Sequence, residues 1–180
     1  LFTARRCVIH STPIAEIVRE RRREFLHKGA WHKFKGYAYA QMGKIRSKSN
    51  STNERRAESI ARIGYDTKFA YHIVRLLDEV QQIMIEHDLD LERNREQLKS
   101  IRRGEWSLNQ IEDYFQLKEK TLEQVYATCT LPHSPDEAKI KQMLMDCLEM
   151  HYGSLEKAVA RDTSSAQLLR EIDIVLDRYR

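Results

Sequence analysis

The stretch RRAESIARIGYDTKFAYHIVRLL, residues Arg55–Leu77, has the pattern of an amphipathic helix that is interrupted once, at Gly64. A glycine inside a helix costs roughly 1 kcal/mol relative to alanine. We therefore expect one long helix, capped by Thr52 or Asn53, that runs to about His87 and bends or briefly opens near Gly64. Apolar residues recur after the glycine at helical spacing and predict its buried face: Phe69, Ile73, Leu76, Leu77, Val80 and Met84.

A row of cationic and hydrogen-bonding side chains borders this apolar face. At about 100° per residue, Lys68, His72 and Arg75 fall in one narrow sector of the helix, with Tyr65 close by. Such a row is suited to line one side of an anion-binding site. Long cationic side chains also line the rim of ordinary hydrophobic cores, and periodicity by itself favours this second interpretation.

The composition predicts an all-α protein. The chain has 180 residues, of which 41% are hydrophobic and 32% charged, with only six Gly and three Pro. That length suits a single helical domain over residues 1–180 with a sizeable core. We expect an irregular bundle of about six to eight helices, with at most one short strand, at Cys7–Ile9.

Charge and cysteine content narrow the class of protein. The net charge of +4 is mild and does not by itself indicate a nucleic-acid-binding protein. Cys7, Cys129 and Cys147 are scattered without Cys-x-x-Cys spacing, so we expect reduced thiols in a cytoplasmic protein and no zinc site. No apolar run approaches the ~20 residues that span a membrane, and no signal peptide is evident. We expect no membrane partner.

Start and stop signals divide the other parts of the sequence into helices. The first predicted helix begins at Pro13, behind a Ser11 or Thr12 cap, and ends at Gly29; a second runs from Trp31 to Arg46 and is followed by a polar loop at Ser47–Asn53. Further along, a short helix over Arg95–Arg102 ends at Gly104, and a capping box at Ser107–Gln110 begins the next helix. Another helix begins at Ser134–Glu137, and a break at Gly153–Ser154 precedes a final pair of helices.

Two charged motifs allow more than one interpretation. The basic run Arg19–Arg23 is either a phosphate-contacting patch or a solvated helix face paired with Glu20 and Glu24, and we favour the pairing. Asp88-Leu89-Asp90 has the alternation by which a strand presents two carboxylates to two metal ions. It lies in a helix-to-helix connector without a Gly-Ser turn, so we assign no metal site to it.

Three segments occur in order along the chain: GYAYAQMGKI at Gly36–Ile45, IARIGYDTKFAYHIVRLL at Ile60–Leu77 and IRRGEWSL at Ile101–Leu108. They resemble the C-terminal half of a family of predicted nucleotidyltransferases from bacteria and phages, within the DNA polymerase β-like superfamily. The resemblance covers residues 1–150 and leaves 151–180 as a C-terminal helical extension. The family's catalytic signature, a Gly-Ser turn followed by a paired-acid strand, is missing and would lie upstream of Leu1.

This resemblance implies that the chain is the helical, nucleotide-enclosing part of an enzyme that transfers NMP from an NTP to an acceptor. The two Mg²⁺ ions that such chemistry uses would be bound outside this chain. The implied partners are an NTP, an N-terminal catalytic domain, and RNA or another nucleic acid as acceptor. We assign no catalytic residue and no metal ligand here, and we expect the chain alone to be inactive.

The resemblance also implies which side chains meet the nucleotide. Lys68 and Arg75 would contact phosphate, and Arg102 and Arg103 would reach the same cleft with bidentate geometry. The remaining candidates are Tyr65 or Tyr37 for stacking on base or sugar, Lys44 and His72 beside the phosphates, and Asp66, which either orients Lys68 or Arg75 or caps the helix after Gly64.

Two other classes of function compete with this one. A nucleic-acid-binding helical module without chemistry would use Arg19–Arg23 and Arg55–Arg56, and its binding would depend steeply on salt. A protein-interaction or assembly domain would expose more apolar helix surface than one core can bury.

Overall fold

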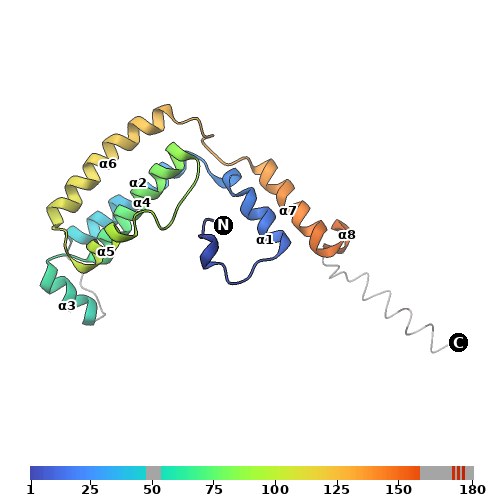
Figure 1. Cartoon of the computed structure of the whole chain (residues 1–180), viewed down its shortest axis with the longest axis horizontal. Helices are drawn as coiled ribbons and strands as arrows, with labels where there is room; N and C mark the ends of the chain where they lie inside the picture. The colour runs from blue at the N-terminus through green and yellow to red at the C-terminus, as the bar shows by residue number, and fades with distance from the viewer. Residues whose placement is uncertain (48–53, 159–171, 173, 175, 177–180) are drawn as a thin grey trace. The chain divides into compact units, whose positions relative to one another are not determined.

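The computed structural model describes residues 1–47, 54–158, 172, 174 and 176, and gives the backbone alone for 54–56, 59, 157 and 158. The chain divides into two compact units, Leu1–Ile140 and Lys141–Arg180. Over these described residues every regular element is a helix and there is no strand (Figure 1). The predicted all-α class is confirmed.

The helices follow one another with short connections. In chain order they are the 3₁₀ turn η1 (Arg5–Cys7), α1 (Pro13–Glu20), the 3₁₀ turn η2 (Arg22–Phe25), α2 (Ala30–Arg46), α3 (Glu54–Ile63), α4 (Thr67–Glu86), α5 (Arg95–Arg103), α6 (Leu108–Thr128), α7 (Glu137–Tyr152) and α8 (Leu155–Ala158). The short strand expected at most at Cys7–Ile9 does not form: Cys7, its first residue, belongs to the 3₁₀ turn η1. Within the described ranges, no helix has the length and apolar content needed to cross a membrane.

Helix α4 is the centre of the first unit, and it packs against α2, α5 and α6 (Figure 1). Its predicted buried face is largely confirmed: Ile73, Leu77, Val80 and Met84 are buried, whereas Phe69 and Leu76 are half-buried. Burying one such side chain contributes about 2 kcal/mol. The residues that meet this face come from all three neighbouring helices: Trp31, Ala38, Met42 and Ile45 of α2, Leu98 and Ile101 of α5, and Ile111, Phe115 and Leu122 of α6.

The single long helix expected around Gly64 is in fact two helices, α3 and α4. Gly64 has φ +90°, a left-handed conformation that glycine adopts without a Cβ clash. Tyr65 then turns into the core, and its hydroxyl donates a 2.6 Å hydrogen bond to the carbonyl of Trp106. Asp66 caps α4 by accepting a hydrogen bond from the Lys68 backbone N–H. The expected cap at Thr52 or Asn53 lies outside the described residues.

Most of the other predicted helix ends are confirmed. Thr12 caps α1, and Ser107 with Gln110 forms the capping box of α6. Gly104 ends α5 at φ +79°, and a Cβ there would lie 2.6 Å from Cδ1 of Ile63. Glycine is therefore needed at this turn both for its conformation and for the close approach of α3.

One boundary differs from the prediction. The first helix ends at Glu20, well before Gly29, and the chain continues through η2 instead. Helix α7 begins at Glu137, the last residue of the predicted Ser134–Glu137 start, and Asp136 directly before it accepts a hydrogen bond from the Lys139 backbone N–H. Residues with short polar side chains in succession offer several possible caps, and the tertiary path of the chain selects among them.

Candidate functional site

Two arginines from different helices lie against one aromatic ring. The guanidinium carbon of Arg75 on α4 is 5.8 Å from the centroid of the Tyr71 ring, and that of Arg102 on α5 is 6.0 Å from it. Both distances are within the range of cation–π attraction, worth roughly 0.5–2 kcal/mol. We name these three residues the Tyr71 cluster. It joins two of the segments on which the resemblance rests.

The charge of Arg75 is only partly neutralised within the protein. Its Nε lies 3.5 Å from Oε1 of Glu79, longer than the 2.7–2.9 Å typical of charge-assisted hydrogen bonds. That Nε is buried and donates no hydrogen bond to the described residues. Burial raises the pKa of Glu79, and the positive charge of Arg75 partly opposes this rise. Glu79 therefore neutralises the charge of Arg75 only in part.

Other predicted residues border the cluster on α4. Lys68 is exposed one helical turn before Tyr71, and the His72 ring lies edge-on to the Tyr71 ring with 5.4 Å between centroids. The sector of Lys68, His72 and Arg75 that helical spacing predicted thus flanks Tyr71. Sequence reasoning missed Tyr71 itself, although its position three residues after Lys68 and four before Arg75 places it on the same helix face.

Arg103 and Tyr65 have partners inside the chain. The Arg103 guanidinium forms an ion pair with Glu105, with Nη2 3.2 Å from Oε2, so Arg102 rather than Arg103 meets Arg75 at the ring. Hydrogen bonding to Glu105 raises the pKa of Arg103. The Tyr65 side chain is 3% exposed, which leaves no ring face for stacking on a base.

The remaining candidates lie on α2 and at the start of α4. The Lys44 ammonium is 5.5 Å from the centroid of the Phe69 ring, and Tyr37 is exposed on α2. Asp66 accepts a hydrogen bond from the Lys68 backbone N–H, and this is the capping alternative of its two predicted roles. Tyr37 and Lys44 therefore belong to a helix, α2, that contributes no residue to the Tyr71 cluster.

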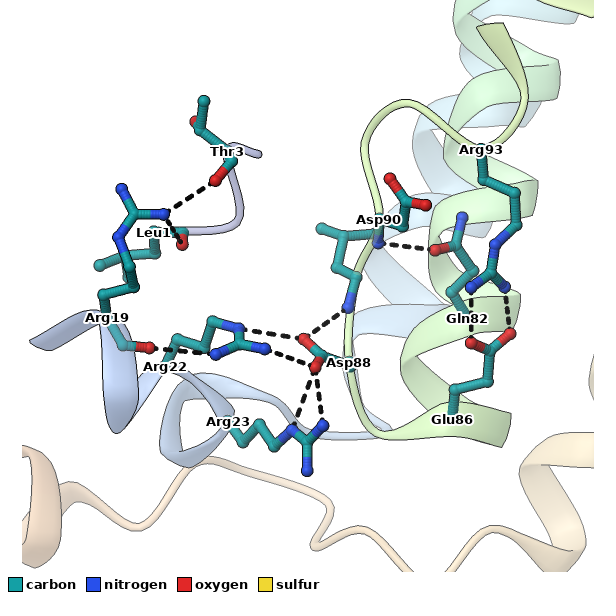
Figure 2. A network of polar contacts seen from close by, with 11 residues as sticks. Leu1, Thr3, Arg19, Arg22, Arg23, Gln82, Glu86, Asp88, Asp90 and Arg93 are labelled. Atoms are coloured by element: carbon teal, nitrogen blue, oxygen red, sulfur yellow. Dashed lines mark hydrogen bonds and ion pairs between the residues drawn. The ribbon is translucent and has the colours of Figure 1, made fainter. Parts of the chain in front are cut away.

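Arginines of the basic run Arg19–Arg23 form ion pairs with acidic side chains (Figure 2). Arg22 and Arg23 both donate to Oδ2 of Asp88, with Nη2 at 2.6 and 2.8 Å, and the Leu89 backbone N–H donates to Oδ1 at 2.9 Å. Arg21 pairs with Glu24 as predicted. Asp88, far away in sequence, was not among the predicted partners.

The same contacts determine what Asp88 can do chemically. Both of its carboxylate oxygens accept hydrogen bonds, so they do not fit a site for two Mg²⁺ ions. In the part of the chain that the structure describes, no group of three or more His, Cys, Asp or Glu residues is placed to hold a metal ion.

A cavity of about 550 Å³ lies beside this network and is lined by Arg19, Arg22, Arg23 and Arg93 among others. Figure 2 shows that these four arginines already have partners within the protein. Arg19 donates to the carbonyl oxygens of Leu1 and Thr3, and Arg93 pairs with Glu86 at 2.7 Å. A new anion in this cavity would have to displace these contacts.

These pairings bear on the nucleic-acid alternative. The described members of the basic run have partners within the chain, and paired arginines contribute less to phosphate binding than solvated ones. The side chains of Arg55 and Arg56, which that alternative also uses, lie outside the described residues.

Asp88 is expected to make stability depend on pH. Burial raises its pKa, but hydrogen bonds from Arg23 and Arg22 outweigh burial and hold the pKa at about 2, against an ordinary value of 3.8. A depressed folded-state pKa contributes stability that is present above about pH 4 and is lost as the pH falls through 2. Asp88→Asn should therefore lower the free energy of unfolding by about 2 kcal/mol at pH 7, and by much less at pH 2.

Urea unfolding of both proteins at pH 7 and at pH 2 measures this difference. Asp113→Asn, at an exposed position on α6, is the matched control and should change little at either pH. An equal effect of Asp88→Asn at the two pH values would show that the ionised carboxylate contributes nothing to stability.

Comparison with known proteins adds no further assignment. No family model matches the chain, no curated protein matches it, and no solved structure matches it. The resemblance to nucleotidyltransferases therefore rests on the three sequence segments that carry it.

Proposed function

We propose that this chain is the helical, nucleotide-enclosing part of a nucleotidyltransferase and that the Tyr71 cluster binds the phosphates of an NTP. The observation that carries the proposal is that Arg75 and Arg102, which come from two separate segments, both lie against the Tyr71 ring. The ion pair of Arg75 with Glu79 is also long, at 3.5 Å. Among the described residues no group of three or more His, Cys, Asp or Glu is placed to hold a metal ion, and the proposal assigns the Mg²⁺ ions and the catalytic carboxylates to a part outside this chain.

The chemistry available to the cluster is electrostatic. A guanidinium presents its N–H groups in a fixed fork that matches two phosphate oxygens. Two guanidiniums held on one ring need little reorganisation when the negatively charged triphosphate arrives. Lys68, one turn earlier on α4, extends the positive surface toward the same ligand. These groups would hold the triphosphate in place while the reaction occurs on an adjoining catalytic domain.

Charge removal at the cluster tests the proposal. Arg75→Gln and Arg102→Gln should each weaken binding of an NTP by about 1–3 kcal/mol, the range for hydrogen bonds to charged groups. Isothermal titration calorimetry with the full chain measures the change. Lys120→Gln, which removes an exposed charge from α6, is the matched control and should leave the affinity nearly unchanged.

Thermal unfolding of the same variants separates binding from folding. Both arginines are partly or largely exposed, so their replacement should move the melting temperature only slightly. If Arg75→Gln and Arg102→Gln bind NTPs as well as the unaltered chain does, the cluster is only a solvated helix face and the proposal is wrong.

A further prediction concerns catalysis. Incubated with labelled NTP, Mg²⁺ and an RNA or DNA acceptor, this chain alone should transfer no label, because Asp88 of its one Asp-x-Asp motif is already paired with Arg22 and Arg23. Gel electrophoresis of the acceptor measures transfer. Transfer that Asp88→Asn or Asp90→Asn abolishes would show that these carboxylates are catalytic after all.

A further inference from the structure

A second cavity, of about 230 Å³, lies between α4, the start of α5 and α6. All but Ile85 of the residues that line it carry a polar or charged side chain. The lining carries two negative charges, from Asp78 and Glu86, and two positive charges, from Arg93 and Lys118, so its net charge is zero. A neutral, hydrogen-bonding ligand suits such a lining better than a free anion or cation does.

One buried carboxylate oxygen in this cavity lacks a donor. Asp78 is 5% exposed. Its Oδ1 accepts a hydrogen bond from the Tyr114 hydroxyl and forms an ion pair with the Lys118 ammonium at 2.8 Å. Its Oδ2 is buried and accepts no hydrogen bond from the described residues. Buried polar atoms are nearly always hydrogen-bonded, so an oxygen of this kind indicates a donor from outside the described residues, either a water molecule or a ligand.

The other polar side chains suit the edge of a nucleobase. Gln81, Gln82, Asn94 and Gln97 line the cavity, and each amide carries a donor and an acceptor. The oxygens of Gln81 and Gln82 already accept hydrogen bonds, from Lys118 and from the Asp90 backbone N–H, so these two residues contribute their amide N–H groups. Amides pair in this way with base edges, and carboxylates accept hydrogen bonds from exocyclic amino groups. Burial and the hydrogen bond to Asp78 raise the pKa of Tyr114, so its phenol stays protonated at neutral pH and keeps donating to Oδ1 of Asp78.

The position of the cavity relates it to the Tyr71 cluster. Asp78 follows Arg75 on α4 by three residues, about 4.5 Å along the helix axis. On α5, Gln97 lines the cavity and Arg102 lies against the Tyr71 ring. Both sites therefore use the same pair of helices, at a separation that one nucleotide can span.

We propose that this cavity holds the base of the nucleotide whose phosphates lie on the Tyr71 cluster, with Asp78 Oδ2 accepting a hydrogen bond from an exocyclic amino group. This inference rests on the proposed function. The proposed substrates are nucleotides whose base carries an amino group, namely adenine, cytosine or guanine. Nucleotides of uracil, which lacks an amino group, should bind less tightly.

Calorimetric titration of the full chain with ATP, CTP, GTP, UTP and inorganic triphosphate tests it. At least one amino-bearing NTP should bind about tenfold or more tightly than both UTP and inorganic triphosphate. Asp78→Asn should reduce the preference for the amino-bearing NTP over UTP about tenfold. The amide that replaces the carboxylate carries an N–H donor, and a donor that faces the amino group of the base forms no hydrogen bond with it. Asn94→Leu, which changes the lining without touching the Asp78 pair, should reduce the ratio as well, whereas Asn109→Leu, on the exposed side of α6, should not.

The outcomes distinguish this inference from the proposed function. If triphosphate and all four NTPs bind equally, and Arg75→Gln weakens them all, the cavity holds water only and the base pocket is wrong while the phosphate site stands. If an amino-bearing NTP is preferred but neither Asp78→Asn nor Asn94→Leu changes the ratio, the base lies elsewhere. If none of these compounds binds, both proposals are wrong. Thermal unfolding of each variant identifies loss of binding that is due to loss of folding.

Discussion

Replacing Ile101 by alanine is expected to lower the free energy of unfolding by about 3 kcal/mol and to weaken NTP binding as well. Ile101 is 0% exposed, and it and Leu98 are the two residues that α5 buries. Truncation removes buried methyl groups and leaves a cavity, and such changes cost about 2–5 kcal/mol. The adjacent residue is Arg102, so loosening α5 also moves a guanidinium away from the Tyr71 ring.

Urea denaturation measures the first effect and calorimetric titration with an NTP the second. Ile101→Val keeps most of the packing and should cost only about 0.5–1.5 kcal/mol. Ile85→Ala, at an exposed position on α4, should change stability by less than about 0.5 kcal/mol. A loss below 1 kcal/mol for Ile101→Ala would mean that α5 is not held on α4 by this side chain.

Removing the ammonium of Lys118 is expected to lower the free energy of unfolding by about 3 kcal/mol. The Asp78 side chain is 6% exposed and that of Lys118 is 20% exposed, with 2.8 Å between Oδ1 and Nζ. Breaking a buried ion pair at one partner leaves a buried charge uncompensated, which typically costs 3–5 kcal/mol, and the partial exposure of Lys118 places this pair at the low end. Lys118→Met keeps the aliphatic part of the side chain, so chemical denaturation of this variant reports mainly the lost charge.

A double-mutant cycle isolates the interaction between the two charges. Asp78→Asn combined with Lys118→Met should cost clearly less than the sum of the two single changes, because neither charge is then left without its partner. Strict additivity would contradict the ion pair. The cycle also matters for the proposed base pocket, since it gives the stability cost of Asp78→Asn on its own.

Helix ends that depend on neighbouring residues were predictable from the sequence. The Ser107–Gln110 capping box and the left-handed Gly104 both act within four residues of the helix end that they define. The buried face of α4 was predictable for a related reason, because the 3.6-residue period places Ile73, Leu77 and Val80 on one side wherever the helix docks.

The break after Gly64 shows where local information is insufficient. A glycine within a helical pattern is compatible with a continuous helix, a bend or a complete stop. The structure has a stop because the Tyr65 hydroxyl reaches the Trp106 carbonyl and Asp66 can then cap α4. Trp106 is distant in the sequence, so no pattern around Gly64 contains this contact.

The sequence by itself determined the all-α class, the buried face of α4 and the set of cations that includes Lys68, Arg75 and Arg102. The tertiary structure alone decided which of these cations meet. It paired Arg22 and Arg23 with Asp88, brought Arg102 instead of Arg103 to the Tyr71 ring, and placed Lys118 beside Asp78. The physical reason is range: caps and helical periodicity act over three or four residues, whereas these pairs depend on how helices pack, and helix packing brings together residues that no local spacing relates.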